Sequence, residues 1–391
     1  MEKILCIAGG IWQKPWIEYL KNKGHYIAVV NPAVTTATEL ADYHIQTDIN
    51  DLDTIDRHIE KIKPSFVTSD QSDISTMIVA TIAAKWNLPG NKIDTIEKLT
   101  NKLEMFRFGR SLGIPMPESA EAASTEEVKA FGLAHGFPII IKPADSTMSR
   151  GFRKIETLVE INDDIFKSTK KFSKTGRVVT QTFISGEMVT LEGVCSGGKH
   201  RTIAVSKKDG FFGPGINTGV QYPYWSPLVE KIVATNDLYV ENTGMKFGLT
   251  HSEFIFENDK FCLIEIGGRG GGAGITDKIV PWVSGINIYE ILYQSLMGKV
   301  IDVKNIQVLQ RPALLRYYTK EQVTNYTEDK NDIIKNLKGV ADFNYNFAGK
   351  QYVTDKNDIR HTMAIYLRET SEEINELENQ IKIIISPIVP S

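Results

Sequence analysis

The sequence has 391 residues, of which 42% are hydrophobic and 24% charged. That length exceeds one ordinary core and predicts roughly two to four domains or lobes of a globular protein. The formal net charge of −3 gives no electrostatic basis for binding nucleic acid or an anionic membrane surface. Widely spaced cysteines and the lack of a long apolar stretch further predict a cytoplasmic protein without disulfides or membrane spans.

The first 98 residues alternate between short apolar runs and amphipathic stretches. Strands alternating with helices predict a parallel sheet. A Gly9-Gly10 pair follows the first strand, but the next residues are Ile-Trp-Gln-Lys. This departs from the G-x-G-x-x-G pattern and argues against a dinucleotide site. The predicted elements are, in order, Ile4–Ala8, 12–24, Tyr26–Val30, 52–62, Phe66–Thr68 and 72–86.

Apolar residues at 96, 99, 103 and 106 predict a helix next, which runs to a stiff Gly-Ile-Pro-Met-Pro segment at 113–117. The chain then enters an apolar strand that ends at Lys142. The loop after it is rich in small hydroxyl residues and glycine, whose amides and hydroxyls can surround phosphate oxygens beside the lysine charge. Taken alone, the same segment also fits a surface loop with an extended lysine.

Residues 251–269 predict a hairpin with Asn258-Asp259 at its turn, after two strands around Ser185-Gly186. Pairing across that turn places Glu253 near residues 264–265, so that Glu253 and Glu265 face one point. Two such carboxylates repel each other unless a cation lies between them. Magnesium is bound in this way, through one or two carboxylates and substrate phosphates. The alternative for Glu253 is an ordinary surface position on a strand.

Arg269 lies in a glycine-rich segment directly after the strand Phe261–Ile266. The glycines allow a sharp turn and close approach of another group, so the stretch indicates a site that holds a cation and an anion. A structural salt bridge in a glycine-rich turn is the alternative. Neighbouring His251 is interpreted as a packing or surface residue.

Taken together, these segments resemble the ATP-grasp enzymes. The resemblance rests on residues 100–117, 139–151, 180–187 and 251–269, which follow one another in the family's order. It implies an α/β ATP-grasp fold in three parts: an N-terminal parallel-sheet domain (1–98), the ATP-grasp domain (99–300, with a lid lobe over about 115–185), and a C-terminal mixed lobe (301–391) that completes the module.

The resemblance also implies a role for each matching position, with ATP as co-substrate and magnesium, or manganese, as the metal. Arg269 would hold the substrate carboxylate or its phosphorylated form, and Lys208, in the segment 205–223, would be a second contact to phosphate or acyl phosphate. Lys102 and Lys142 would hold the ATP phosphates under a lid of Ser146, Ser149 and Gly151. The backbone of Thr182, Phe183 and Ile184 would contact the adenine, and Glu187 would contact the ribose. Glu253 and Glu265 would bind the metal.

The activity implied is that of a carboxylate–amine ligase, which activates an acid as an acyl phosphate and transfers it to an amine. Partners would be a small carboxylic acid and an amine, and a homodimer is compatible with the sequence. The aromatic segment 211–225 favours an organic acid over bicarbonate. A bicarbonate-dependent carboxylase is one alternative. Another is an ATP-binding regulatory protein with weak catalysis, because Thr182 and Gly267 replace the family's usual glutamate and asparagine.

Overall fold

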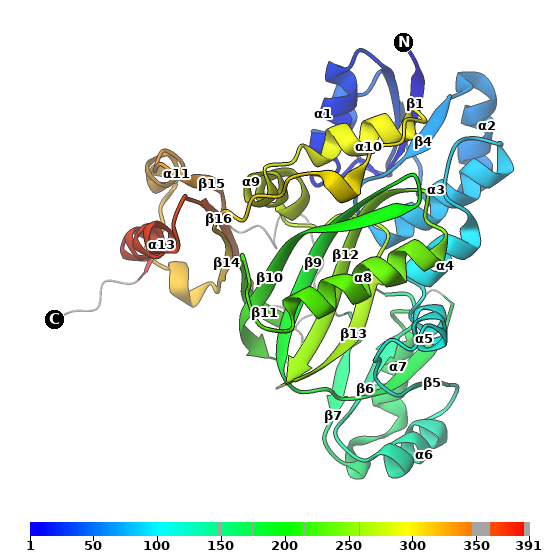
Figure 1. Cartoon of the computed structure of the whole chain (residues 1–391), viewed down its shortest axis with the longest axis vertical. Coiled ribbons are helices and arrows are strands. Elements are labelled where there is room, and N and C mark those ends of the chain that lie inside the picture. The colour runs from blue at the N-terminus through cyan, green and yellow to red at the C-terminus, as the bar shows by residue number, and fades with distance from the viewer. Residues whose placement is uncertain (147–149, 174, 214–215, 258, 346–359, 387–391) are drawn as a thin grey trace.

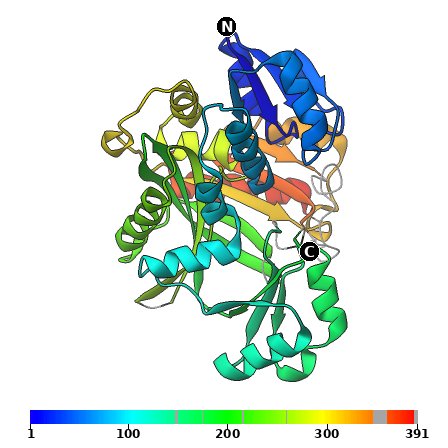
Figure 2. The same cartoon turned by 90° about the vertical axis from the view of Figure 1, so that its right-hand side faces the viewer.

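The computed structural model describes residues 1–146, 150–173, 175–213, 216–257, 259–345 and 360–386. The described strands form a four-stranded sheet near the N-terminus, a second four-stranded sheet and a central sheet of eight strands (Figure 1). The N-terminal sheet and the second four-stranded sheet lie at opposite ends of the molecule in both views (Figures 1 and 2). Among the described residues, none of the helices is long and apolar enough to cross a membrane.

The N-terminal sheet is parallel, as predicted, with strand order β3-β2-β1-β4. Ile4 pairs with Ile27 on one side and with Phe66 on the other, so the three strands end at the same edge. The first helix begins at Lys14 and leaves Trp12 outside it, because Pro15 suits a helix start. The elements are β1 (Lys3–Ile7), α1 (Lys14–Asn22), β2 (Tyr26–Val30), β3 (Tyr43–Ile45), α2 (Leu52–Ile62), β4 (Phe66–Thr68) and α3 (Asp73–Lys85).

The single helix predicted from residue 96 to the segment at 113–117 is two helices, α4 (Ile93–Thr100) and α5 (Lys102–Ser111). Asn101 separates them with an extended backbone, and its side chain accepts hydrogen bonds from the backbone amides of Leu103 and Glu104. This is an N-cap, which satisfies amides that a new helix leaves unpaired. The break places Lys102 in the first turn of α5.

The second four-stranded sheet belongs to a small lobe and has strand order β5-β8-β6-β7. Its strands are all antiparallel, and residues 139–143 and 153–155 pair as the two strands predicted on either side of the polar loop. The elements are β5 (Ser119–Ala122), α6 (Thr125–His135), β6 (Ile139–Pro143), β7 (Arg153–Ile155), α7 (Asp163–Lys170) and β8 (Val178–Thr182).

The central sheet has the order β13-β12-β9-β10-β11-β14-β16-β15, and its pairs are antiparallel. Helix α8 lies across one face (Figure 1). Strands from beyond residue 300 extend the same sheet, so the C-terminal part is continuous with the centre. The elements are β9 (Glu187–Ser196), β10 (Lys199–Gly213), β11 (Ile216–Tyr222), α8 (Val229–Thr243), β12 (Phe247–Glu257), β13 (Lys260–Gly267), α9 (Val280–Ser284), α10 (Ile288–Leu296), β14 (Ala313–Tyr318), α11 (Glu328–Lys335), β15 (Val340–Asn344), β16 (Thr362–Leu367) and α13 (Ser371–Ile385).

Several short turns of 3-10 helix and one π-helical turn connect these elements. The π-helical turn, η3, follows the glycine-rich segment that contains Arg269 and carries Asp277. Such turns occur often at functional sites. The short turns are η1 (Thr38–Leu40), η2 (Leu158–Glu160), η3 (Ile275–Ile279), η4 (Val303–Asn305) and η5 (Glu321–Val323).

Candidate active site

The two predicted metal ligands face each other across the β12–β13 hairpin. Glu253 pairs with Glu265, and the register shifts by one residue directly after this pair. A bulge at this point re-aims the side chains of one strand. The Glu253 side chain is 22% exposed and that of Glu265 32%, so both carboxylates are reachable but largely enclosed. The predicted pairing of Glu253 with residues 264–265 is confirmed, and the role of the two carboxylates as metal ligands stays a prediction.

Lysine ammonium groups lie against both carboxylates. Lys208 on β10 donates to Glu253 Oε1 at 2.7 Å, and the Lys102 Nζ lies 3.4 Å from Glu265 Oε1. Burial by itself would raise the pKa of Glu253, but Lys208 and His251 together hold it well below its usual range. Both carboxylates therefore face positive charge. Within the described ranges, no three His, Cys, Asp or Glu side chains gather as a metal site. A pair of carboxylates suits Mg²⁺, which takes its remaining ligands from phosphates and water.

Lys142, one residue before the end of β6, lies near this pair and is 7% exposed. Burial, and then the nearby charge of Lys102, lowers the pKa of Lys142 to about 8. Among the described residues, none accepts a hydrogen bond from the Lys142 ammonium group, which lies 5.4 Å from the centre of the Phe106 ring. Two enclosed ammonium groups near one another form a site for an anion such as a phosphate.

The predicted phosphate lid adjoins both lysines. Lys102 Nζ donates to the backbone carbonyl of Ser146 at 2.9 Å, which ties α5 to the start of the loop. Gly151 has a φ of +74°, and a Cβ there would lie 2.9 Å from Pro143, so the position requires glycine. Ser149, the remaining predicted lid residue, lies outside the described residues.

The predicted adenine contacts Thr182, Phe183 and Ile184 lie where the chain passes from β8 to β9, between the small lobe and the central sheet. The amide of Phe183 donates to the carbonyl of Pro138 at 3.2 Å. Glu187 begins β9, and its carboxylate accepts from Lys207 and, at 2.7 Å, from Tyr224. A role for Glu187 at the ribose therefore stays a prediction and would require sharing these contacts.

Arg269 is paired with a residue of the N-terminal domain that the sequence analysis did not select. Its guanidinium donates to Asp73, at the start of α3, at 3.1 Å from Nε and 3.4 Å from Nη2. A Cβ at Gly267 would lie 2.9 Å from the Asp73 carboxylate, so an asparagine there would collide with this pair. The glycine at that position therefore makes room for the contact between the two domains.

His251 lies beside the carboxylate pair with a largely buried side chain, which is 13% exposed. Its Nδ1 lies 2.5 Å from Glu192 Oε1, and its Nε2 lies 3.7 Å from Glu253 Oε1. Burial by itself would lower the pKa of His251, but Glu192 outweighs it and raises the pKa to about 9. The imidazolium thus joins Glu192, which is 2% exposed, to the carboxylate pair. In the sequence, the position of His251 two residues before Glu253 on one strand was the signal that both side chains lie on the same face, because alternate residues of a strand share a face.

The part of the aromatic segment that the structure describes contains three rings, and they do not gather in one pocket. Tyr222 is 1% exposed and packs in the main hydrophobic core, and Tyr224 packs on Phe256. Trp225, by contrast, is 67% exposed. The side chains of residues 211–216 lie outside the described part. These three rings therefore give no support to an apolar pocket for an organic substrate.

Comparison with known proteins gives the family of this region. Residues 99–273 match the model of the ATP-grasp domain family. The chain carries an ATP-grasp domain. All of the candidate residues named above for ATP, metal and substrate fall within this range.

The ATP-grasp fold extends over the whole chain. The L-amino acid ligase from Bacillus licheniformis superposes with a TM-score of 0.81 at 16% identity, over 100% of this chain and 99% of that one. The biotin carboxylase domain of the Hydrogenobacter thermophilus 2-oxoglutarate carboxylase gives 0.78 at 13% identity, over 99% and 90%. The phosphoribosylglycinamide synthetase from Anaerococcus prevotii gives 0.71 at 15% identity, over 100% of both chains. The predicted fold class is thereby confirmed.

Proposed function

We propose that this protein is an ATP-dependent carboxylate–amine ligase. The observation that carries the proposal is the arrangement of Lys102 and Lys142 beside the opposed carboxylates Glu253 and Glu265, with Arg269 at the end of the same strand. The lysines suit ATP phosphates, and the carboxylates would hold a magnesium ion. Magnesium would neutralise the charge that develops on the transferred phosphoryl group.

In the proposed reaction, the substrate carboxylate attacks the γ-phosphate of ATP, which forms an acyl phosphate and ADP. The amine then attacks the acyl carbon, so that an amide forms and inorganic phosphate leaves. Arg269 would orient the acid through the guanidinium N–H groups that its contacts with Asp73 and the Gly270 carbonyl leave free. Lys208, which lies against Glu253, would stabilise the phosphate that is transferred. The protein contributes position and electrostatic stabilisation, and its lid excludes water from the acyl phosphate.

The solved structures named above support an enzyme that activates an acid, but they differ in which acid is activated. One is an L-amino acid ligase, whereas another was determined with bicarbonate and magnesium–ADP. The second candidate is therefore a carboxylase that activates bicarbonate as carboxyphosphate. A regulatory protein with weak catalysis is less well supported, because the unusual Gly267 has a structural reason in the Asp73–Arg269 pair.

The proposal is tested by measuring ADP release from magnesium–ATP in the presence of pools of amino acids and small acids, with mass spectrometry of the products. We expect ADP only when an acid and an amine are both present, together with a product of their summed mass less one water. ADP release without any condensed product, in all pools, would contradict the proposal.

A further inference from the structure

Asp73 of the N-terminal domain holds one side of the Arg269 guanidinium. Its Oδ1 lies 3.1 Å from Nε and its Oδ2 lies 3.4 Å from Nη2, and the side chains of arginine and aspartate are 18% and 11% exposed. Nη1 donates to the carbonyl of Gly270 at 3.2 Å. Of the five N–H groups of a guanidinium, one on Nη1 and one on Nη2 have no acceptor among the described residues. Asp73 therefore fixes the arginine and leaves N–H groups for a further anion.

The segments that carry Asp73 and Arg269 are also joined through their backbones. The amide of Gly270 donates to the carbonyl of Asp70 at 2.8 Å. A Cβ at Gly267 would lie 2.9 Å from Asp73 Oδ1 and 3.2 Å from Arg269 Nε, so the lack of a side chain at that position permits the ion pair. Residues on both sides of Arg269 are thus placed against the loop that precedes α3.

The backbone directly before Asp73 has an uncommon conformation. Ser72, the N-cap of α3, has a φ of +88° and a ψ of +118°, which a residue with a Cβ rarely adopts. Its carbonyl accepts from the hydroxyl of Thr76 at 2.9 Å, and its side chain accepts from the amide of Ser75. Strained backbone persists where surrounding contacts fix it, and it is concentrated at ligand sites and active sites. The conformation of Ser72 therefore supports a functional role for the residue that follows it.

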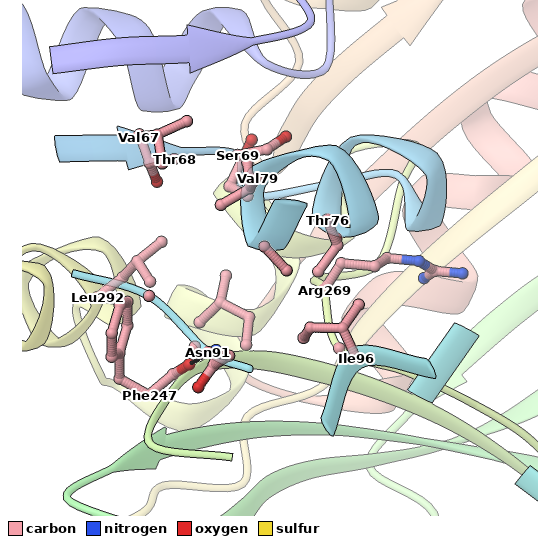
Figure 3. A pocket seen from close by; sticks show the side chains of 16 residues that line it. Val67, Thr68, Ser69, Thr76, Val79, Asn91, Ile96, Phe247, Arg269 and Leu292 are labelled. Atoms are coloured by element: carbon pink, nitrogen blue, oxygen red, sulfur yellow. Dashed lines mark hydrogen bonds between the residues drawn. The ribbon is translucent and has the colours of Figure 1, made fainter. Parts of the chain in front are cut away.

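The orientation of Arg269 matters because other carboxylates lie near it. Burial by itself would lower the pKa of Arg269, but the charge of Asp73, followed by those of Glu265 and Glu192, raises it. An ion pair with Glu265 would remove both a predicted metal ligand and the predicted substrate contact from the reaction. In Figure 3 the stem of Arg269 passes Thr76 of α3, and its guanidinium points away from the cavity of about 40 Å³ that the stem helps to line. The arginine is instead paired with the N-terminal domain.

We propose that Asp73 is a positioning residue, which orients Arg269 and thereby sets the affinity for the acid substrate. This proposal rests on the ligase function proposed above, in which Arg269 binds the acid. The substrate carboxylate would accept from the N–H groups of Nη1 and Nη2 that the protein leaves free. Without the Asp73 carboxylate the guanidinium gains other orientations, so the acid binds more weakly. The ATP phosphates, which Lys102 and Lys142 would bind, are not affected.

The test compares the acid with ATP in the steady-state kinetics of Asp73→Asn, which keeps the shape and removes the charge. ADP release is measured with hydroxylamine as the amine, while either magnesium–ATP or an equimolar mixture of the standard amino acids and small organic acids is varied. We expect the half-saturating concentration of the acid mixture to rise about tenfold, the effect of losing one hydrogen bond to a charged group. The KM for ATP should not change. Asp53→Asn, at an exposed position of the same domain, should change neither value.

Gly267→Ala disturbs the same ion pair from the other strand and provides a second variant. It should also raise the half-saturating acid concentration selectively, and it should add little to the effect of Asp73→Asn, because residues that act through one contact are not additive. Half-saturating concentrations do not depend on how much of a variant is folded. A lower kcat with unchanged acid dependence, an equal rise for acid and ATP, or additive effects of the two changes would overturn the positioning role. A wild type that releases no ADP with the acid mixture would instead contradict the ligase function itself.

Discussion

Glu265 combines a position opposite Glu253 with a contact to Lys102, and its role can be isolated by an isosteric change. Glu265→Gln retains the shape and removes the charge. We expect ADP release with acid and amine to fall by at least about 100-fold, because a lost metal ligand removes several kcal/mol of transition-state stabilisation. The assay is steady-state ADP formation, with Glu230→Gln on the exposed side of α8 as the matched control. Wild-type turnover in a folded Glu265→Gln protein would disprove the assignment.

Lys142 predicts a pH dependence of ATP use. Its pKa is lowered to about 8, so the ammonium form prevails below that pH and is lost as the pH rises through it. Since only the charged form attracts phosphate, kcat/KM for ATP should fall about tenfold between pH 7 and pH 9. Lys142→Arg should remain active with a flatter profile, because a guanidinium stays charged throughout. Equal pH profiles for the two proteins would show that another group causes the decline.

The site contacts that could be predicted from the sequence join residues close together in the chain, whereas those that could not be predicted join distant residues. Glu253 and Glu265 lie on one hairpin, so a turn signal and strand pairing were sufficient to align them. The partners of Arg269 and His251 are Asp73 and Glu192, which are 196 and 59 residues away. No local pattern links such positions, and their pairing depends on how separate sheets and domains pack.

The loop between β6 and β7 gives a prediction for hydrogen exchange. Ser146 is joined to Lys102 through its carbonyl, and Lys102 is expected to contact ATP. We therefore expect amides of the segment 145–151 to exchange more slowly when a non-hydrolysable ATP analogue and magnesium are present, since binding adds partners to a polar loop. Mass spectrometry of peptides covering this segment measures the effect, with α13 as an internal reference. Equal exchange with and without the analogue would count against a phosphate lid.

Periodicity predicted most element types but not where helices break or which sheet a strand joins. Apolar spacing continues through Asn101, so one helix was expected, whereas the N-cap geometry of that residue divides it. The short strand β3, residues 43–45, gives no clear pattern and was not predicted. The strands on either side of Ser185-Gly186 exist as predicted, yet β8 and β9 belong to different sheets. Strand partners depend on tertiary packing, which a single segment does not encode.

The site lies where three parts of the chain converge. The N-terminal domain supplies Asp73, the small lobe supplies Lys142, and the central sheet supplies Glu253, Glu265 and Arg269. The order of the motifs between residues 100 and 269 was sufficient to indicate the ATP-grasp fold, although none of them lies in the N-terminal domain. The relative placement of the parts is set by contacts such as Asp73–Arg269, so the substrate side of the site could not be predicted.

The acid substrate would contact groups from more than one part of the chain. Comparing an organic acid with bicarbonate in the same assay distinguishes the two candidate reactions. Arg269 could hold either acid, because bicarbonate and an organic carboxylate are both planar anions. The two candidate reactions differ in whether an organic acid must be supplied. We expect ADP release to require an organic acid and an amine, and hydroxylamine to trap the activated acid as a hydroxamate. Reactions prepared free of carbon dioxide should proceed at the same rate, and added bicarbonate should not replace the acid. Full turnover with bicarbonate as the sole acid, together with ¹³C incorporation from labelled bicarbonate into the product, would establish the carboxylase and leave the fold assignment unchanged.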